Sequence, residues 1–208
     1  MMIPEKLIYD ILKTEGKQNK AVVVIHGWKG NKDSFKAITS IMKIPKVKWL
    51  FPQAPYKMSD KNEEYSWAFE NSDGIFETKK TVDLFGRFLE ENILSMIDSR
   101  KVFFIGFSQG ATMCYDFILQ LKYPWGGVFP VAGFKRNSES VFKIHKNQQS
   151  TPIVIGHGLK DDVIPIASSE NIYEELKNSN CNVSFEKFGG RHKISIDYLK
   201  KIRSIINE

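Results

Sequence analysis

The sequence predicts an α/β domain with a mostly parallel, twisted sheet of about seven strands and helices on both faces. Two observations predict it: apolar runs alternate with segments of helical spacing, and several of those runs are apolar throughout, as in strands buried on both sides. The expected strands are Leu7–Leu12, Ala21–Ile25, Val47–Phe51, Val102–Phe107, Gly127–Val131, Ile153–Gly156 and Val183–Phe188. The first is expected at an edge, antiparallel to its neighbour.

The helical segments complete the pattern. The longest is expected over Ile75–Ile97, where apolar residues recur at spacings of three and four. Further helices are expected after Asp33, Gln109, Ser168 and Lys193. Repeats, low-complexity tracts and linkers do not interrupt the chain, so residues 1–208 are predicted to form one domain without a large inserted cap.

Composition narrows the class of protein. A chain of 208 residues with 42% hydrophobic content suits one globular domain with a substantial core. No apolar run approaches the ~20 residues of a membrane span, and the charged N-terminal segment is unlike an export signal. We therefore expect no integral membrane association. With only Cys114 and Cys181 in the chain, a reducing cytoplasm is the expected setting.

The charge balance argues against nucleic-acid binding. The net charge of +6 arises from 30 Lys and Arg against 24 Asp and Glu. The basic residues are mostly scattered lysines rather than a compact run interleaved with aromatic residues. We therefore expect a small-molecule partner and no nucleic acid, for a protein that is a monomer or a homodimer.

A candidate nucleophile lies between a strand and a helix. The strand at Val102–Phe107 leads into Gly106-Phe-Ser-Gln-Gly110, and a helical segment follows. This strand, G-x-S-x-G, helix order is typical of a nucleophile elbow, in which a tight turn holds the serine in a strained conformation. The small glycines let strand and helix approach each other behind Ser108. The helix N-terminus favours negative charge developing there.

A serine nucleophile needs a base and an acid that orients the base. Downstream of the elbow, the strand at Ile153–Ile155 runs into a loop with Asp161 and Asp162. His192 follows a later alternating strand and a glycine pair. The order serine, acid, histidine is the one expected for strand-end loops in this type of site.

A fourth element lies upstream, where a continuous apolar strand ends in His26-Gly-Trp-Lys-Gly30. A glycine-containing loop after an early core strand is where such enzymes place one amide of the oxyanion hole. We assign the two oxyanion donors to the backbone N–H groups of Trp28 and Gln109. The expected donors are the backbone amides rather than the side chains, because the amides contact the oxyanion.

Together these motifs carry a resemblance to a known family. They are Ile25-His-Gly-Trp28, Phe51-Pro-Gln-Ala-Pro55, Ser66-Trp-Ala-Phe69, Gly106-Phe-Ser-Gln-Gly110, His157-Gly-x-x-Asp161 with Ile164-Pro165, and His192. The set resembles the phospholipase/carboxylesterase family of α/β-hydrolases, which includes acyl-protein thioesterases and short-chain carboxylesterases. The resemblance spans roughly Val22 to His192. It implies that Ser108 is the nucleophile, His192 the base and Asp161, rather than Asp162, the acid.

One long irregular segment, Phe51–Phe69, is rich in aromatic residues. Connections of this length are usually functional or disordered, and the aromatic content argues against disorder. We expect Tyr56, Trp67 and Phe69 to form part of a shallow, open substrate pocket. The alternative is a surface loop held by its own aromatic residues.

The sequence therefore predicts a serine hydrolase of carboxylic esters or thioesters that forms an acyl-serine intermediate. No cofactor or metal is expected, because the four histidines lie on separate loops without metal-ligand spacing. A triad-based acyltransferase or peptidase, a dienelactone-hydrolase-like enzyme, and a non-catalytic ligand-binding protein of the same fold remain alternatives. Acyl chain length and the choice between ester and thioester are left open.

Overall fold

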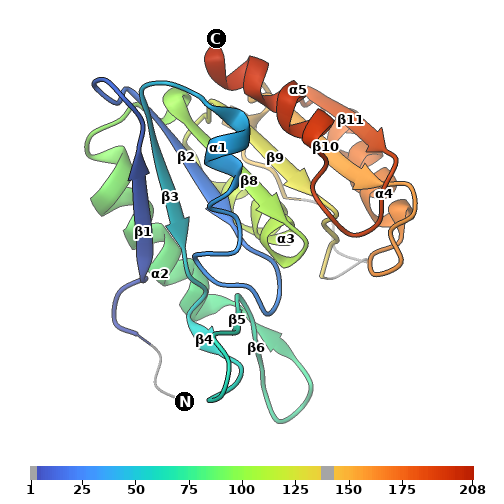
Figure 1. The fold of residues 1–208 in the computed structure, drawn as a ribbon. Helices are drawn as coiled ribbons and strands as arrows, with labels where there is room; N and C mark the ends of the chain where they lie inside the picture. The colour runs from blue at the N-terminus through green and yellow to red at the C-terminus, as the bar shows by residue number, and fades with distance from the viewer. Residues whose placement is uncertain (1–3, 137–142) are drawn as a thin grey trace.

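The computed structural model describes residues 4–136 and 143–208. Its centre is a twisted seven-stranded sheet (Figure 1). In spatial order the strands are β1 (Tyr9–Lys13), β3 (Val47–Pro52), β2 (Lys20–Ile25), β8 (Val102–Phe107), β9 (Gly127–Val131), β10 (Ile153–Gly158) and β11 (Val183–Phe188). Only β1 runs antiparallel to its neighbour, at one edge of the sheet. The predicted sheet and its antiparallel edge strand are both confirmed.

Helices cover both faces of this sheet, as the sequence predicts. They are α1 (Ile38–Met42), α2 (Lys79–Leu89), α3 (Gln109–Asp116), α4 (Ile166–Asn178) and α5 (Ile196–Asn207). Apolar residues of α2, α3 and α4 join one buried cluster, and those of α1 and α5 join a second cluster on the opposite face. Alternate residues of β2 enter the two clusters, because successive side chains of a strand point to opposite faces.

Two predicted helices differ from the structure. The segment expected to be helical from Ile75 instead continues as a hairpin of β6 (Phe69–Glu70) and β7 (Phe76–Glu77), and α2 begins at Lys79. The Asn71 Oδ1 atom accepts hydrogen bonds from the N–H groups of Asp73 and Ile75 and so closes the hairpin turn, against the apolar periodicity. After α2 the chain forms a π-helical turn. Likewise, α1 begins only at Ile38 rather than soon after Asp33.

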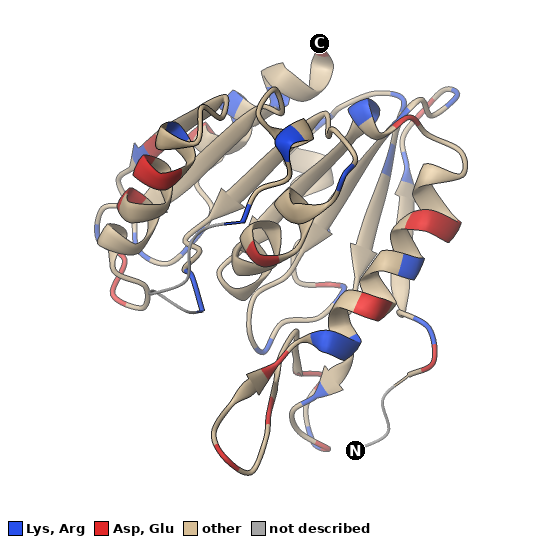
Figure 2. Cartoon of the chain, turned by 180° about the vertical axis from the view of Figure 1, so that it is seen from behind, with Lys and Arg blue, Asp and Glu red and all other residues tan. Residues whose placement is uncertain are grey.

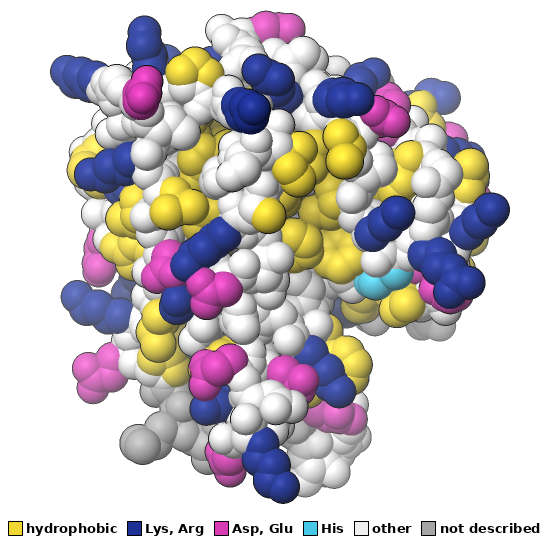
Figure 3. All heavy atoms as spheres, in the orientation of Figure 1, with side chains coloured by type: hydrophobic (Ala, Val, Ile, Leu, Met, Phe, Trp, Pro, Cys, Tyr) yellow, Lys and Arg dark blue, Asp and Glu magenta, His cyan; other side chains and the backbone are white. Residues whose placement is uncertain are grey.

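Short elements complete the chain. A second hairpin consists of β4 (Tyr56–Lys57) and β5 (Tyr65–Ser66). Both hairpins project beyond the strand ends of the main sheet (Figure 1), and in the same orientation the molecular surface has a protruding lobe there (Figure 3). Single 3₁₀ turns cover Ser99–Lys101, Ile118–Gln120 and Lys146–Gln148. Figure 2 shows the molecule from behind relative to Figure 1, and in this view Lys and Arg are interspersed with Asp and Glu. No helix in the described part of the chain has both the length and the apolar character needed to cross a bilayer.

Glycines allow the contact that positions the candidate site. A Cβ atom on Gly106 would lie 2.5 Å from the Gly110 carbonyl oxygen, and one on Gly110 would lie 2.7 Å from that of His26. The N-terminus of α3 therefore packs directly on the ends of β8 and β2. Because the carboxyl ends of parallel strands meet at one edge, the loops after β2, β8, β10 and β11 gather there.

Candidate active site

The turn between β8 and α3 holds Ser108 in a strained backbone conformation. Its φ and ψ angles are 52° and −115°, in a region that residues other than glycine rarely occupy. The Ser108 N–H donates to the Val131 carbonyl at 2.8 Å, and the Ser108 carbonyl accepts from the Thr112 N–H at 3.0 Å. Both of its backbone groups are thus engaged, which fixes the turn as the elbow motif predicts.

His192 and Asp161 form a close pair on the loops after β11 and β10. The His192 Nδ1 atom lies 2.7 Å from Asp161 Oδ2. An ionised carboxylate only accepts, so Nδ1 carries the proton of the neutral ring and Nε2 is left as a base. The second oxygen, Oδ1, accepts from the N–H groups of Val163 and Ile164, each at 2.9 Å.

The surroundings of Asp161 favour its charged form. Burial by itself raises the pKa of this carboxyl group, but the hydrogen bonds from His192, Ile164 and Val163 outweigh burial and hold the pKa below its ordinary value. The Asp161 side chain is only 1% exposed. Its charge is therefore held beside the imidazole and is largely shielded from solvent.

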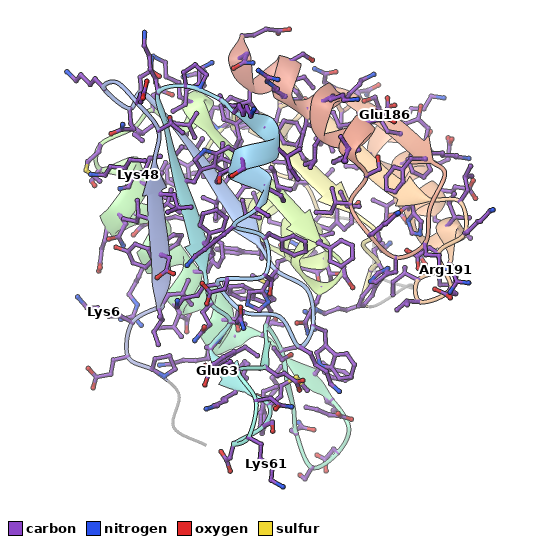
Figure 4. The ribbon with its side chains drawn as sticks, in the orientation of Figure 1. Lys6, Lys48, Lys61, Glu63, Glu186 and Arg191 are labelled. Carbon is purple, nitrogen blue, oxygen red and sulfur yellow. The ribbon has the colours of Figure 1, made fainter. Side chains whose placement is uncertain are left out.

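The neighbouring aspartate has different surroundings. Asp162 is exposed and pairs with Arg191 at 3.3 Å, and Figure 4 shows Arg191 at the outer margin of the molecule. Of the two candidates, only Asp161 contacts His192. Screening by solvent leaves little energy in an exposed pair such as Asp162–Arg191.

A second histidine supports Asp161, and the sequence reasoning assigned it no role. The His157 Nε2 atom lies 3.4 Å from Asp161 Oδ2 and 2.9 Å from the Ile164 carbonyl oxygen. Because a carbonyl only accepts, Nε2 carries the proton, and Nδ1 accepts from the Ser169 hydroxyl at 2.8 Å. The signal for this residue was present in the spacing His157-Gly-x-x-Asp161.

Ring packing brings the histidine to the elbow. The Phe107 ring, directly before Ser108, contacts the His192 ring with 4.7 Å between centroids. Phe35 also packs against Phe107, with 5.5 Å between ring centroids. The structure therefore brings the sequence-predicted residues Ser108, Asp161 and His192 to the same edge of the sheet.

The loop after β2 borders the elbow through its backbone. A Cβ atom added to Gly27 would lie 3.3 Å from the Ser108 Cβ atom. Trp28 is 57% exposed, and the ammonium group of Lys29 lies 4.7 Å from the centre of its ring. The Gln109 N–H lies in the first turn of α3, where amides have no intrahelical acceptor.

The buried His26 ring fixes this loop, which the sequence reasoning did not anticipate. Its Nε2 atom accepts from the Ala54 N–H at 3.1 Å, so the proton of the neutral ring is on Nδ1, 2.7 Å from the Gly27 carbonyl oxygen. Burial lowers the pKa of His26 to about 4, against a smaller opposing effect of the Gly27 carbonyl. The His-Gly pair after a buried strand was its only sequence signal.

The three aromatic residues expected in the substrate pocket have different surroundings. Tyr56 and Trp67 are buried, and Trp67 packs against Phe85 with 5.6 Å between ring centroids. Phe69 is 40% exposed and lies against Tyr56. Trp67 is 0% exposed and offers no surface to a substrate, so its expected placement is corrected to the interior. Tyr56 keeps a small exposed area, as Ser108 does, and for Tyr56 and Phe69 the pocket role remains a prediction.

Comparison with known proteins identifies the family. The family model described as phospholipase/carboxylesterase matches residues 8–208, so the chain belongs to this family, as its motifs predict. Acyl-protein thioesterase 1 of Debaryomyces hansenii is 26% identical over 221 residues, covering 95% of this chain and 94% of the relative. The protein of the same name in Kluyveromyces lactis is 25% identical over 181 residues, covering 78% of each chain.

Solved structures show the same fold. The crystal structure of esterase PE8 has a TM-score of 0.81 at 21% identity, covering 97% of this chain and 98% of that one. SOBER1 of Arabidopsis thaliana has a TM-score of 0.75 at 21% identity, covering 90% of this chain and 97% of its own. The domain is an α/β-hydrolase fold, and no cap domain is evident in the described residues.

The buried His26 ring predicts a pH dependence of stability. Between about pH 6.5 and about pH 4, the unfolded chain binds a proton at His26 that the folded protein does not bind. The free energy of unfolding therefore falls as the pH is lowered through this window, by about 3 kcal/mol for a shift of this size. Urea unfolding of wild type and His26→Asn at several pH values measures it.

The variant removes the titrating ring, so its unfolding free energy will change less with pH over the same range. Equal pH slopes in wild type and His26→Asn would show that His26 is not held neutral by the fold.

Proposed function

We propose that this protein is a serine hydrolase that cleaves small-molecule carboxylic esters or thioesters through an acyl-Ser108 intermediate. One arrangement of residues is the main support for the proposal. The His192 Nδ1–H is bonded to the buried Asp161 carboxylate, and the His192 ring packs on Phe107, the residue before the strained Ser108. Membership of the phospholipase/carboxylesterase family supports it, as do relatives named acyl-protein thioesterase and carboxylesterase.

In the proposed acylation step His192 acts first as a base and then as an acid. As the Ser108 hydroxyl oxygen attacks the carbonyl carbon, His192 Nε2 removes the hydroxyl proton. Asp161 holds the ring orientation and stabilises the imidazolium. When the tetrahedral intermediate collapses, the same proton passes from Nε2 to the leaving alcohol or thiol, and the acyl group remains on Ser108.

Water completes the cycle. His192 removes a proton from a water molecule that attacks the acyl carbon, and returns it to Ser108 as the carboxylic acid leaves. In both tetrahedral intermediates the oxyanion accepts hydrogen bonds from the N–H groups of Trp28 and Gln109. Removing one such donor typically costs about 10²–10³ in kcat. The N-terminus of α3 adds favourable electrostatics at Ser108.

We place this activity in a reducing compartment such as the cytoplasm. Both cysteines are free: Cys114 is buried behind the elbow, and Cys181 is partly exposed. Burial raises the pKa of both thiols, so neither is activated as a nucleophile.

Covalent labelling tests the nucleophile. A fluorophosphonate probe is expected to label the wild-type protein and not Ser108→Ala. Hydrolysis of p-nitrophenyl esters and acyl-CoA thioesters of graded chain length is expected to fall by about 10⁴–10⁶ in the same variant. Ser95→Ala, which alters a serine on an exposed turn after α2, serves as the control. Labelling or turnover that persists in Ser108→Ala would contradict the proposal.

The adjacent aspartates provide a matched pair of variants for the acid. Asp161→Asn keeps the shape but favours the wrong imidazole tautomer, which costs about 10⁴ in turnover in the best-studied triad. Asp162→Asn removes only a contact with Arg191 and is expected to keep activity within about tenfold. Steady-state kinetics of both variants measures this difference. The reverse ranking would assign the acid to Asp162.

A further inference from the structure

Two buried polar side chains near the site have no part in the mechanism above. Trp67 is 0% exposed and Gln109 is 7% exposed, yet each makes directed hydrogen bonds to neighbouring chain segments. Buried polar groups generally form hydrogen bonds, so the informative point is which groups they join. Here Trp67 bonds to His26, next to the loop of the first candidate oxyanion amide, and to Gln109, which carries the second.

The direction of the first amide, the Trp28 N–H, is set by the orientation of its own peptide group. The Gly27 carbonyl and the Trp28 N–H belong to one planar trans peptide, so they point in opposite directions. The Gly27 carbonyl oxygen accepts from His26 Nδ1 at 2.7 Å and from the Gly30 N–H at 3.0 Å. Two donors therefore fix the orientation of this peptide, and with it the direction of the Trp28 N–H.

His26 is in turn held by Trp67. The Trp67 indole N–H donates to the His26 carbonyl oxygen at 2.9 Å, and the two rings lie 5.0 Å apart. The Trp67 carbonyl accepts from the Thr81 hydroxyl at 2.8 Å, which ties this residue to α2. The side chain at position 67 thus anchors the end of β2 from which the oxyanion loop begins.

The second amide is tied to the same segment. The Gln109 Oε1 atom accepts from the Trp67 N–H at 3.0 Å, and its Nε2 donates to the Ser66 hydroxyl at 2.9 Å. That hydroxyl donates to the Ala68 carbonyl at 2.8 Å. The residue whose backbone N–H faces the oxyanion therefore uses its side chain to hold residues 66–68.

We propose that the side chains of Trp67 and Gln109 are positioning residues that join both oxyanion amides into one hydrogen-bonded unit. This inference rests on the proposed function, because it concerns the same oxyanion hole. It goes beyond that function because Gln109 acts in the mechanism only through its backbone N–H and Trp67 has no role there, whereas here the side chain of each has one.

The hydrogen-bonded unit is expected to stabilise the transition state more than the bound substrate. Charge on the carbonyl oxygen develops only as Ser108 attacks, so misaimed amides weaken the intermediate and leave the bound ester little changed. Loss of either side chain therefore lowers kcat while KM changes little. It also weakens binding of a trifluoromethyl ketone, which forms an oxyanion on addition of the serine, in proportion to the loss of kcat/KM.

Two variants remove the hydrogen bonds and keep the approximate volume: Trp67→Phe and Gln109→Met. The fold offers a matched control for each. Trp125 is buried and donates its indole N–H to the Ile118 carbonyl at 3.0 Å. Gln148 is buried, and its side-chain amide donates to the carbonyls of Leu121 and Tyr123. Trp125→Phe and Gln148→Met therefore remove comparable bonds far from the site.

Kinetics, inhibitor affinity and thermal melting are measured on all four variants and on Ser108→Ala. Trp67→Phe and Gln109→Met are expected to lose about 10- to 100-fold in kcat, with KM within about threefold and the same pH dependence of kcat/KM. The two controls are expected to lower Tm comparably and keep kcat within about twofold. Should Trp67→Phe not fold, Gln109→Met and Ser66→Ala carry the same test.

Wild-type kcat and inhibitor affinity in Trp67→Phe and Gln109→Met would overturn the inference, as would equal kcat losses in the control variants. Either result leaves the proposed function intact if Ser108→Ala is inactive. Activity that survives in Ser108→Ala overturns the proposed function itself.

Discussion

The close approach of α3 to the ends of β8 and β2 is the constraint on which the candidate site depends. Gly106 and Gly110 permit it, because a side chain at either position would overlap backbone atoms of the neighbouring segment. The contact places the strained Ser108 and the first amides of α3 against the loop after β2. Larger residues would force these elements apart and separate Ser108 from the Gly27–Trp28 peptide.

Two histidines near this contact have opposite electrostatic surroundings. His26 is buried, and both ring nitrogens are bonded to backbone groups, so it remains neutral and serves as a fixed part of the loop. His192 remains partly exposed, and its Nδ1 atom is held by the Asp161 carboxylate at 2.7 Å, so that Nε2 is not the atom bound to the carboxylate. The same side-chain type thus supports rigidity in one place and, in the proposed mechanism, proton transfer in the other.

Local patterns carried most of the information on the fold. Strands such as β8 and β11 were predicted with their observed bounds, because apolar or alternating runs between turn residues are local signals. The elbow, the aspartate pair and His192 were also visible as motifs placed after strands. The start of α2 was missed, because a side chain in the Asn71 turn competes with helical periodicity.

What the sequence did not reveal depends on contacts between distant residues. Trp67 was expected to contact substrate, but its indole meets a carbonyl 41 positions away in the chain. The role of His26 likewise depends on the Ala54 amide, 28 positions away. Hydrophobic patterns and motif spacing do not report contacts between residues far apart in the chain. The positions of Trp67 and His26 in the hydrogen-bond network were therefore found only in the folded structure.

We infer that two backbone amides, held in place by the hydrogen bonds of Trp67 and Gln109, stabilise the oxyanion formed at Ser108. A crystal structure of the protein after reaction with a phosphonate ester would show this contact. We expect a bond from Ser108 Oγ to phosphorus, with one phosphonyl oxygen about 2.7–3.1 Å from the nitrogens of both Trp28 and Gln109. A phosphonyl oxygen that faces solvent, or that only side chains contact, would contradict it.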